Sequence, residues 1–541
     1  MRRFVDGVAL DESIGMRRRT PNRVADDAFL DDRQRWCTGV LFNFLYQSAV
    51  AGNHGFRQTQ TALTSFWMMK EGLQLAYETP VVGYPWSIPF EFPLFQAIAA
   101  ATTSILPLSL DASGRLVSVL FLLGCAAPAI QIANRLKVKT DTVCLFLALL
   151  WTSPIYMFWA RTFMIETCAL FLALMAMVYA LDLRAKKPRI NAVVGFAFWA
   201  SLGLLQKATT AAPVLLICGV LVMWAHVRLP EGWRFPPLRT IAAIAAAFAL
   251  PLFIGLGWAH YTDVVKSRND VGAMLTSSSL MAWNFGGLDM RFDGKFWHRV
   301  IFKRVWSYNA GGVIGVLLVA WALWRGDPGT RKLLLSCLAL FIAPIVIFSN
   351  LHNAHSYYQT SCAVFLVAAV ALAVDALGQR LSRRPVVAVL GAILLVVNMW
   401  GFSKEYLPLM ASPLPDSGAR TLTLAKVIQD YTPQTSGIVV FGIDWTSEIA
   451  YYGERRSMTY PEWFSTGEQF WSDPDAQLGG LELGAAVFCD VENEVERKAL
   501  LSRPTIQESG GLYPVEDCFV WLPKQQGAIR VEDVPEPVLA L

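Results

Sequence analysis

The sequence predicts a polytopic α-helical membrane protein that carries a small α/β domain at its C-terminal end. Of the 541 residues, 54% are hydrophobic and only 16% are charged, and the mean hydropathy is +0.41. A soluble globule of this length carries fewer apolar and more charged residues. The net charge of +4 is small. Because the basic residues gather beside hydrophobic segments, this charge does not indicate nucleic-acid binding.

Residues 1–35 are expected to form a cytoplasmic tail. They contain many arginines but no hydrophobic core region, which a cleavable signal peptide would need. Eleven hydrophobic segments of about spanning length follow, and residues 36–402 are therefore predicted to form the membrane domain. The segments are 36–52, 114–134, 141–160, 164–183, 191–206, 208–227, 240–259, 310–324, 333–349, 359–378 and 386–402.

Basic residues predict the orientation of these segments. With the N-terminus inside, all five inner connections carry lysine or arginine, as the positive-inside rule requires. The loop 260–309 is placed outside although it is also basic, because inverting it would put two later basic loops on the wrong side. Eleven spans then leave the C-terminal end outside the cell's inner (cytoplasmic) membrane.

The first outer loop, 53–96, is too polar to cross the membrane, since each charge at the centre of a span costs roughly 2.5–3.5 kcal/mol. From Arg57 to Leu73, apolar residues recur at helical spacing opposite a polar face. This pattern predicts a short helix in the membrane interface. A second interfacial run is expected to begin at Glu91, after a proline-rich turn.

Residues 403–541 are predicted to form an extracytoplasmic α/β domain. A helix is expected over Leu422–Tyr431, and apolar runs predict strands at 437–442, 485–489 and 518–522. Cys489 and Cys518 could form a disulfide or stay as two buried reduced thiols. The sequence leaves both alternatives open, because it does not supply the Cα spacing that a disulfide requires.

In this topology the conspicuous polar residues converge on the outer face. They are His54, Arg57 and Glu91 in the first outer loop, Arg161 and Glu166 around the second, Lys207 at the third, and His355 and Tyr358 at the fifth. A site that lies partly in the bilayer suits a substrate with a lipid tail and a polar head.

Four of these stretches together resemble the GT-C glycosyltransferases. The stretches are Phe90–Leu94, Ala160–Glu166, Gln206–Ala208 and His355–Tyr358. The chain is most similar to the branch containing the protein mannosyltransferases and the lipid A aminoarabinose transferase, over roughly residues 36–402. The resemblance implies a polyprenyl-phosphate sugar donor on the outer face and transfer, with inversion, to an acceptor hydroxyl of a cell-envelope glycan, a lipid or a protein. It implies no cofactor.

Glu91 is the first candidate for the general base. An acceptor hydroxyl becomes a good nucleophile when a nearby carboxylate takes its proton. Alternatively, Glu91 complements the dipole of a helix that begins at Pro93. The mannosyltransferases have an adjacent acidic pair where this chain reads Asn53–Arg57, which leaves His54 as a second candidate. Glu166 either orients the acceptor, holds a cation or pairs with Arg161.

Arg57, Arg161 and Lys207 suit the phosphate of the donor, because fixed cations stabilise the charge that grows on a leaving phosphate. Alternatively, their side chains reach toward lipid headgroups. His355 and Tyr358 are predicted to hydrogen-bond the same phosphate. His352 and His355 lack a clear third ligand, so no metal site is predicted.

Two other functional classes remain open. A lipid or glycan transporter would be expected to show internal repeats and ionisable residues near the bilayer midplane, whereas here such residues lie at the ends of segments. A non-catalytic envelope-assembly protein would use the C-terminal domain for recognition.

Overall fold

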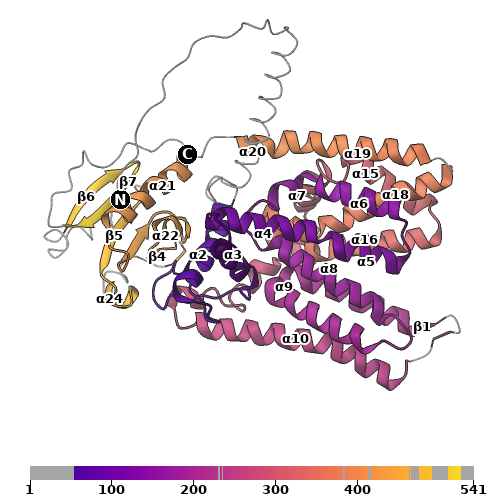
Figure 1. Cartoon of the computed structure of the whole chain (residues 1–541), viewed down its shortest axis with the longest axis horizontal. Coiled ribbons are helices and arrows are strands. Elements are labelled where there is room, and N and C mark those ends of the chain that lie inside the picture. Colours follow the sequence, from indigo (N-terminus) through magenta and orange to yellow (C-terminus); the bar gives the residue numbers. More distant parts are fainter. Residues whose placement is uncertain are drawn as a thin grey trace, which may run out of the picture. The chain divides into compact units, whose positions relative to one another are not determined.

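The computed structural model describes residues 54–229, 232–233, 236–381, 384–411, 416–461, 463–464, 474–489 and 510–524. All of them belong to one compact unit, Ser48–Leu541. The predicted tail, 1–35, and the first predicted segment, 36–52, lie outside the described residues. The described chain contains a helical part followed by a mixed α/β part (Figure 1).

The helical part supplies the scaffold. Its elements are α2 (Gly55–Glu71), α3 (Leu94–Ile105), α4 (Leu110–Gly124), α5 (Ala126–Leu136), α6 (Thr140–Trp151), α7 (Pro154–Trp159), α8 (Glu166–Leu183), α9 (Ile190–Val227), β1 (Arg228–Leu229), β2 (Gly232–Trp233), α10 (Leu238–Lys266), α11 (Asp270–Ala273), α12 (Met281–Phe285), α13 (Leu288–Phe292), α14 (Gly294–Trp297), the π-helix η2 (His298–Trp306), α15 (Gly312–Arg325), α16 (Pro328–Ile347), α17 (Ser349–Ala354), the 3₁₀ helix η3 (Ser356–Ser361), α18 (Ala363–Leu381), α19 (Arg384–Glu405) and α20 (Leu407–Ala411).

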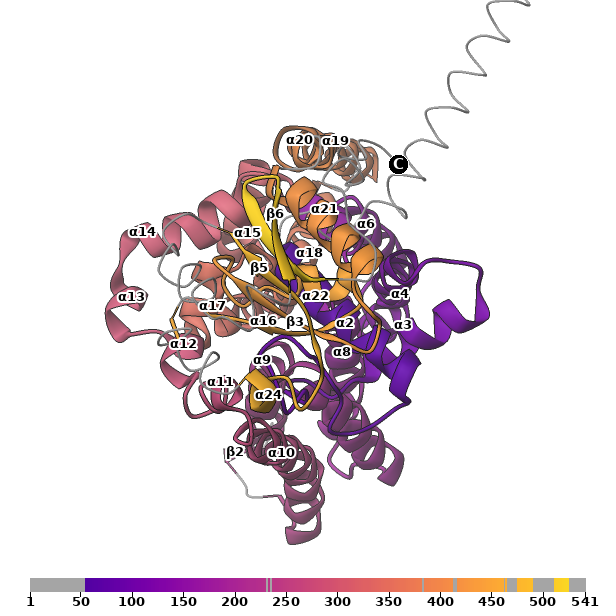
Figure 2. The ribbon, with the colours of Figure 1, turned by 90° about the vertical axis from the view of Figure 1, so that its left-hand side faces the viewer.

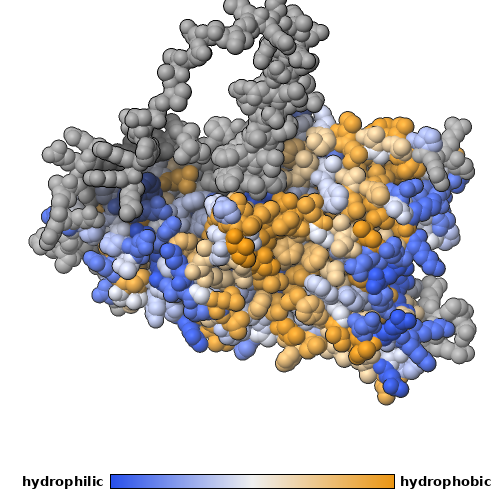
Figure 3. Space-filling model, viewed as in Figure 1, coloured by the Kyte–Doolittle hydropathy of each residue, from blue (hydrophilic) through white to orange (hydrophobic). Residues whose placement is uncertain are grey.

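Seven helices of the described chain are long and apolar enough to cross a membrane. They are Leu110–Leu136, Glu166–Leu183, Ile190–Val227, Leu238–Lys266, Pro328–Ile347, Ala363–Leu381 and Pro385–Glu405. Apolar side chains cover much of the helical part on the face that Figure 3 shows, and hydrophilic side chains gather at the helix ends. The chain is a multi-pass membrane protein, while eleven spans and their orientation stay predictions.

Two predicted segments differ from the observed helices. The segment 141–160 is interrupted, because α6 ends at Trp151 and α7 begins at Pro154. Proline has no N–H to continue the hydrogen bonds of the preceding helix. The segment 310–324 corresponds to α15, which has only 14 residues and is shorter than the ~20 residues of a perpendicular span.

Helix α9 contains a reversal at Lys207. Its backbone is extended there, with φ −162° and ψ 93°. A Cβ atom built on Gly203 would lie 3.3 Å from the Cβ of Ala211, although residues eight apart in a straight helix are separated by about 12 Å. The chain therefore turns back at Lys207, which confirms the prediction of two separate segments, 191–206 and 208–227.

Helix α2 forms where the sequence predicted it. Gln60 and Thr64 on its polar face are buried, whereas Met69 on its apolar face is 44% exposed. The polar face is buried because α2 packs against α3, α4 and α22 (Glu448–Gly453), and it lies beside α22 in both views (Figure 2). The position of this helix in the membrane interface stays a prediction.

The α/β part confirms the predicted helix and strands. It contains α21 (Asp416–Tyr431), α24 (Pro474–Gln477), β3 (Gly437–Phe441), β4 (Arg456–Thr459), β5 (Leu483–Phe488), β6 (Gly510–Val515) and β7 (Cys518–Pro523). The strand order is β4-β3-β5-β7-β6. Strand β3 is parallel to β4 and β5, whereas β7 is antiparallel to β5 and β6.

Both faces of this sheet are covered. Ile438 and Val440 of β3 pack with Ile428 of α21, whereas Val439 packs in a cluster with Leu63 of α2. A strand that is buried on both faces reads as a continuous apolar run, as this one does. Cys489 and Cys518 form a disulfide, which decides between the two predicted states.

The first loop of the helical part also covers the edge of the sheet. The amides of Ser457 and Thr459 in β4 donate to the carbonyls of Pro80 (3.1 Å) and Val81 (2.6 Å), and Gly83 donates to Ser457 (3.1 Å). An unpaired edge strand exposes a row of polar backbone groups. Here the loop that leads toward Glu91 satisfies part of that row.

Candidate functional site

The backbone around Glu91 is fixed by contacts from three directions. The Tyr77 hydroxyl donates to the carbonyl of Glu91 and accepts from the amide of Phe90, both at 2.8 Å. The indole of Trp258 in α10 donates to the carbonyl of Phe90 (3.0 Å), and the amide of Phe92 donates to Leu205 O in α9 (2.9 Å). Glu91 is therefore held against two of the apolar helices.

Glu91 forms an ion pair with Arg57 of α2. The second arm of the guanidinium donates to Gln60 Oε1 (2.6 Å). Burial alone would lower the pKa of Arg57, but the Glu91 carboxylate, together with Tyr357, Glu166 and Tyr358, holds this pKa above its ordinary value. Arg57 therefore stays charged. Beside this pair lies a cavity with room for about one water molecule.

Glu166 and Lys207 form a second ion pair, with Lys207 Nζ 2.5 Å from Glu166 Oε1. Glu166 begins α8 and Lys207 lies at the reversal of α9, so two helix ends meet here. The ammonium lies 4.3 Å from the ring centroid of Tyr358 and 5.2 Å from that of Tyr357. Of the three roles predicted for Glu166, the structure therefore shows that its carboxylate holds a cation, Lys207.

Histidine and tyrosine rings form one wall of the site. The His54 ring lies 5.4 Å from His355, 5.1 Å from Tyr357 and 5.6 Å from Trp159, measured between ring centroids. Tyr358 stacks on His355 at 5.9 Å. Sequence positions 54 and 355 are therefore brought together, as the common outer face predicted.

The histidines of this wall favour their neutral forms. Burial and nearby charges, including Lys207 and Arg304, lower the pKa of His355 to about 4 and that of His352 to about 3. Burial and Arg304 also lower the pKa of His54. At neutral pH these rings can donate or accept hydrogen bonds, but they do not act as cations.

Several buried polar atoms around the two ion pairs have no hydrogen bond within the described residues. They are Glu166 Oε2, both ring nitrogens of His352, Gln96 Oε1 and Gln206 Nε2. Gln96 borders the same small cavity as Arg57 and Glu91. Folded proteins pair most of their buried polar atoms. A polar ligand or a bound water at this place would satisfy these atoms.

Arg161 occupies a neighbouring position. Its side chain is buried, and its guanidinium carbon lies 5.0 Å from the centroid of the Phe158 ring. Burial, followed by the charge of Arg115, lowers the pKa of Arg161 to about 9. Arg161 is thus a buried cation that contacts the Phe158 ring and lies near a second cation, Arg115.

Arg304 is a site residue that no sequence pattern indicated. Its guanidinium donates to the carbonyls of His352 (2.7 Å) and Asn353 (3.0 Å), so it fixes the turn before His355. Arg291 donates in the same way to backbone carbonyls, and Lys266 donates to Leu275 O and pairs with Asp263. The excess of cations in the loop 260–309 is therefore explained, at these three residues, by contacts within the protein.

Comparisons with known proteins define the fold. No protein-family model matches the chain, and no curated protein matches its sequence. Among solved structures, ArnT from Cupriavidus metallidurans in the apo state matches with a TM-score of 0.58 and 12% identity, over 91% of this chain and 98% of that chain. The chain has the GT-C fold. This confirms the fold that the sequence resemblance implied.

Two further structures agree. ArnT bound to undecaprenyl phosphate gives a TM-score of 0.55 at 12% identity, over 90% of this chain and 96% of that chain. An oligosaccharyltransferase from Archaeoglobus fulgidus, tethered with an acceptor peptide, gives 0.50 at 12% identity, over 91% of this chain and 74% of that chain. Identities this low establish the GT-C fold but not a shared substrate.

Proposed function

We propose that this chain is a membrane glycosyltransferase that moves a sugar from a polyprenyl phosphate to an acceptor hydroxyl on the outer face of the membrane. The observation that carries the proposal is the meeting of two carboxylate–cation pairs, Arg57–Glu91 and Lys207–Glu166, beside His355 and Tyr358. The GT-C fold supports it. The undecaprenyl phosphate of one similar structure and the acceptor peptide of another are the corresponding kinds of donor and acceptor.

The proposed reaction is a single displacement. The acceptor oxygen forms a bond to the anomeric carbon while the bond from that carbon to the phosphate oxygen breaks. The electron pair leaves with the polyprenyl phosphate, and the hydroxyl proton passes to Glu91. Attack opposite to the leaving group inverts the anomeric configuration. Arg57 and Lys207 stabilise the negative charge that develops on the phosphate.

Accessibility separates the roles of the two carboxylates. The Glu91 side chain is 18% exposed and borders the cavity, whereas that of Glu166 is 4% exposed. We assign Glu91 as the general base and Glu166 as the residue that positions Lys207. Neutral His54 is the second candidate for the base, because its lone pair can accept a proton.

The remaining predicted residues act on the donor. His355 and the Tyr358 hydroxyl are proposed to hydrogen-bond the phosphate. Arg161 adds positive potential, two residues from the Trp159 ring that contacts His54. The Cys489–Cys518 disulfide supports an extracytoplasmic position for the C-terminal domain, because such bonds form in oxidising compartments.

The decisive experiment uses cells that lack this protein. Mass analysis of their envelope glycans, glycolipids and proteins should reveal a component that has lost one sugar. Wild-type protein should restore the sugar, and the Glu91→Gln variant should not. Purified protein should then transfer the same sugar from its polyprenyl-phosphate donor in vitro. An unchanged set of glycoconjugates, with the donor redistributed across the membrane, would instead support the transporter alternative.

A further inference from the structure

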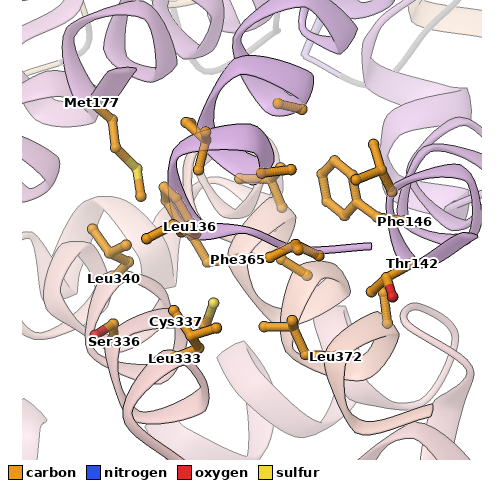
Figure 4. A pocket seen from close by; sticks show the side chains of 18 of the residues that line it. Leu136, Thr142, Phe146, Met177, Leu333, Ser336, Cys337, Leu340, Phe365 and Leu372 are labelled. Atoms are coloured by element: carbon orange, nitrogen blue, oxygen red, sulfur yellow. The ribbon is translucent and has the colours of Figure 1, made fainter. Parts of the chain in front are cut away.

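A second cavity lies in the helical part, away from the two ion pairs. Helices α5, α6, α8, α16 and α18 enclose it, and its volume is about 130 Å³. This resembles the ~150 Å³ of an engineered cavity that binds benzene. Leu136, Phe146, Met177 and Phe365 are among the side chains around it (Figure 4). The lining is almost entirely apolar and suits part of a hydrocarbon chain.

Two exposed lysines flank this cavity. Lys137 lies between the lining residues Leu136 and Val138, and Lys332 directly precedes the lining residue Leu333. Within the described chain, neither lysine has an ion pair. Their basic neighbours differ, since Arg135 pairs with Asp182 (2.8 Å) and Lys139 pairs with Asp375 (3.3 Å). Asp141, beside the lining residue Thr142, is the carboxylate next to the same lining, so two lysines and one carboxylate leave a net positive charge beside the apolar cavity.

Thr142 provides an independent sign of a ligand. Its side chain borders the cavity (Figure 4) and is only 3% exposed, and its hydroxyl has no hydrogen bond within the described residues. A buried hydroxyl without a partner is unfavourable. A ligand with an acceptor oxygen at this level would satisfy it.

We propose that this cavity binds an anionic phospholipid. One acyl chain fills part of the apolar space, an ester oxygen accepts a hydrogen bond from Thr142, and the phosphate lies between Lys137 and Lys332. Basic pockets between membrane helices commonly bind such headgroups. A zwitterionic lipid of the same chain length fits the apolar space equally well but gains less from two unpaired lysines.

Native mass spectrometry of the purified full-length protein tests this proposal. Phosphatidylglycerol and phosphatidylcholine with identical chains are added separately, and the bound lipid is counted. We expect phosphatidylglycerol to bind more tightly. The double change Lys137→Gln/Lys332→Gln should weaken its binding on the order of 10- to 30-fold, since each basic residue near anionic lipid contributes about fivefold. Lys186→Gln/Lys187→Gln, a charge-matched control in another exposed loop, should leave binding unchanged.

Two further variants test the cavity itself. Thr142→Val keeps the shape of the side chain but removes the hydroxyl, and it should weaken phosphatidylglycerol binding about 2- to 10-fold. Ala368→Leu fills the space between α18 and its neighbours and should reduce the binding of both lipids. If Ala368→Leu does not fold, Thr142→Val and the lysine variants still test whether the cavity binds the lipid. Equal binding of both lipids by the wild type, or binding that neither Thr142→Val nor the lysine change alters, would contradict an anionic-lipid site in this cavity.

Discussion

The two ion pairs of the site have the same chemistry in different surroundings. Arg57 and Glu91 come from a short helix and a loop, and their side chains are 16% and 18% exposed. Lys207 and Glu166 come from the ends of two apolar helices and are 5% and 4% exposed. The first pair borders a cavity, whereas the second is enclosed. The first pair can therefore exchange partners with a substrate, while the second holds its two helix ends, and with them the charge of Lys207, in place.

The energetic consequence is that equal substitutions should give unequal results. Removing one member of an enclosed ion pair leaves a charge without compensation, which typically costs about 3–5 kcal/mol. Where water reaches the pair, the cost is smaller. We therefore expect changes at Glu91 to affect turnover most, and changes at Glu166 or Lys207 to affect folding as well.

The largest effect is expected for Glu91→Gln. The amide keeps the shape of the side chain but cannot accept the hydroxyl proton, so the transfer rate should fall by about 10²- to 10⁴-fold, or about 3–5 kcal/mol of barrier. The loss should appear in kcat, measured with purified donor and acceptor. Glu166→Gln and His54→Ala are measured beside it. A near-normal rate for Glu91→Gln together with a collapsed rate for His54→Ala would transfer the role of base to His54.

A double-mutant cycle compares the two pairs directly. Lys207→Gln leaves the Glu166 carboxylate buried alone and should lower the free energy of unfolding by about 3–5 kcal/mol. Lys207→Gln/Glu166→Gln should recover much of this loss, because no buried charge remains. The control is the corresponding cycle at Arg57 and Glu91, for which a smaller loss is expected. Similar losses in the two cycles, measured by unfolding in detergent, would contradict the difference in burial.

Donor affinity gives a third comparison. Arg57→Gln and Lys207→Gln should each weaken donor binding, because each removes a cation from the phosphate site. Lys207→Arg should be milder, since it keeps the charge but changes the geometry. Titration with undecaprenyl phosphate measures this effect. Unchanged affinity in both glutamine variants would remove these residues from the donor site.

The neutral histidines predict a pH dependence of stability. Their pKa values, about 3 for His352 and about 4 for His355, lie below the ordinary value near 6.5. Between pH 6.5 and about 4, the unfolded chain therefore binds more protons than the folded chain. The stability that the neutral histidines contribute should be fully present above pH 6.5 and should be lost as the pH decreases through this window. His352→Gln should flatten this dependence in unfolding measurements, and an unchanged slope would contradict it.

The smallest effect is expected where the α/β part holds the first loop. Arg456 of β4 contacts Glu71 and Glu78, both at 2.9 Å, and lies over the Trp67 ring. Arg456→Gln should loosen the segment that leads to Glu91 and slow transfer only a few-fold, with the stability cost of about 1 kcal/mol that is typical of such pairs. Arg420→Gln removes the pair with Asp517 inside the α/β part and should not affect transfer. Equal effects of the two variants would indicate general destabilisation.

The sequence by itself determined the elements whose signal is local. Continuous apolar runs gave α8, α10, α16, α18 and α19, because about 20 apolar residues are sufficient to define a membrane helix. Short apolar runs that contain β-branched and aromatic residues predicted β3, β5 and β7. The sequence also showed which polar residues lie at the ends of segments, and it predicted the turn at Lys207.

Only the tertiary structure decided which of these residues meet. Glu91 pairs with Arg57 across 34 positions, and Lys207 pairs with Glu166 across 41, and no local pattern specifies such partners. Periodicity predicted α2 as a helix but not the burial of its polar face, since it records how residues are spaced on one helix and not which neighbours cover them. The buried polar face of α2 and the carbonyls bound by Arg304 depend on chain segments far away in sequence, so their roles follow from packing alone.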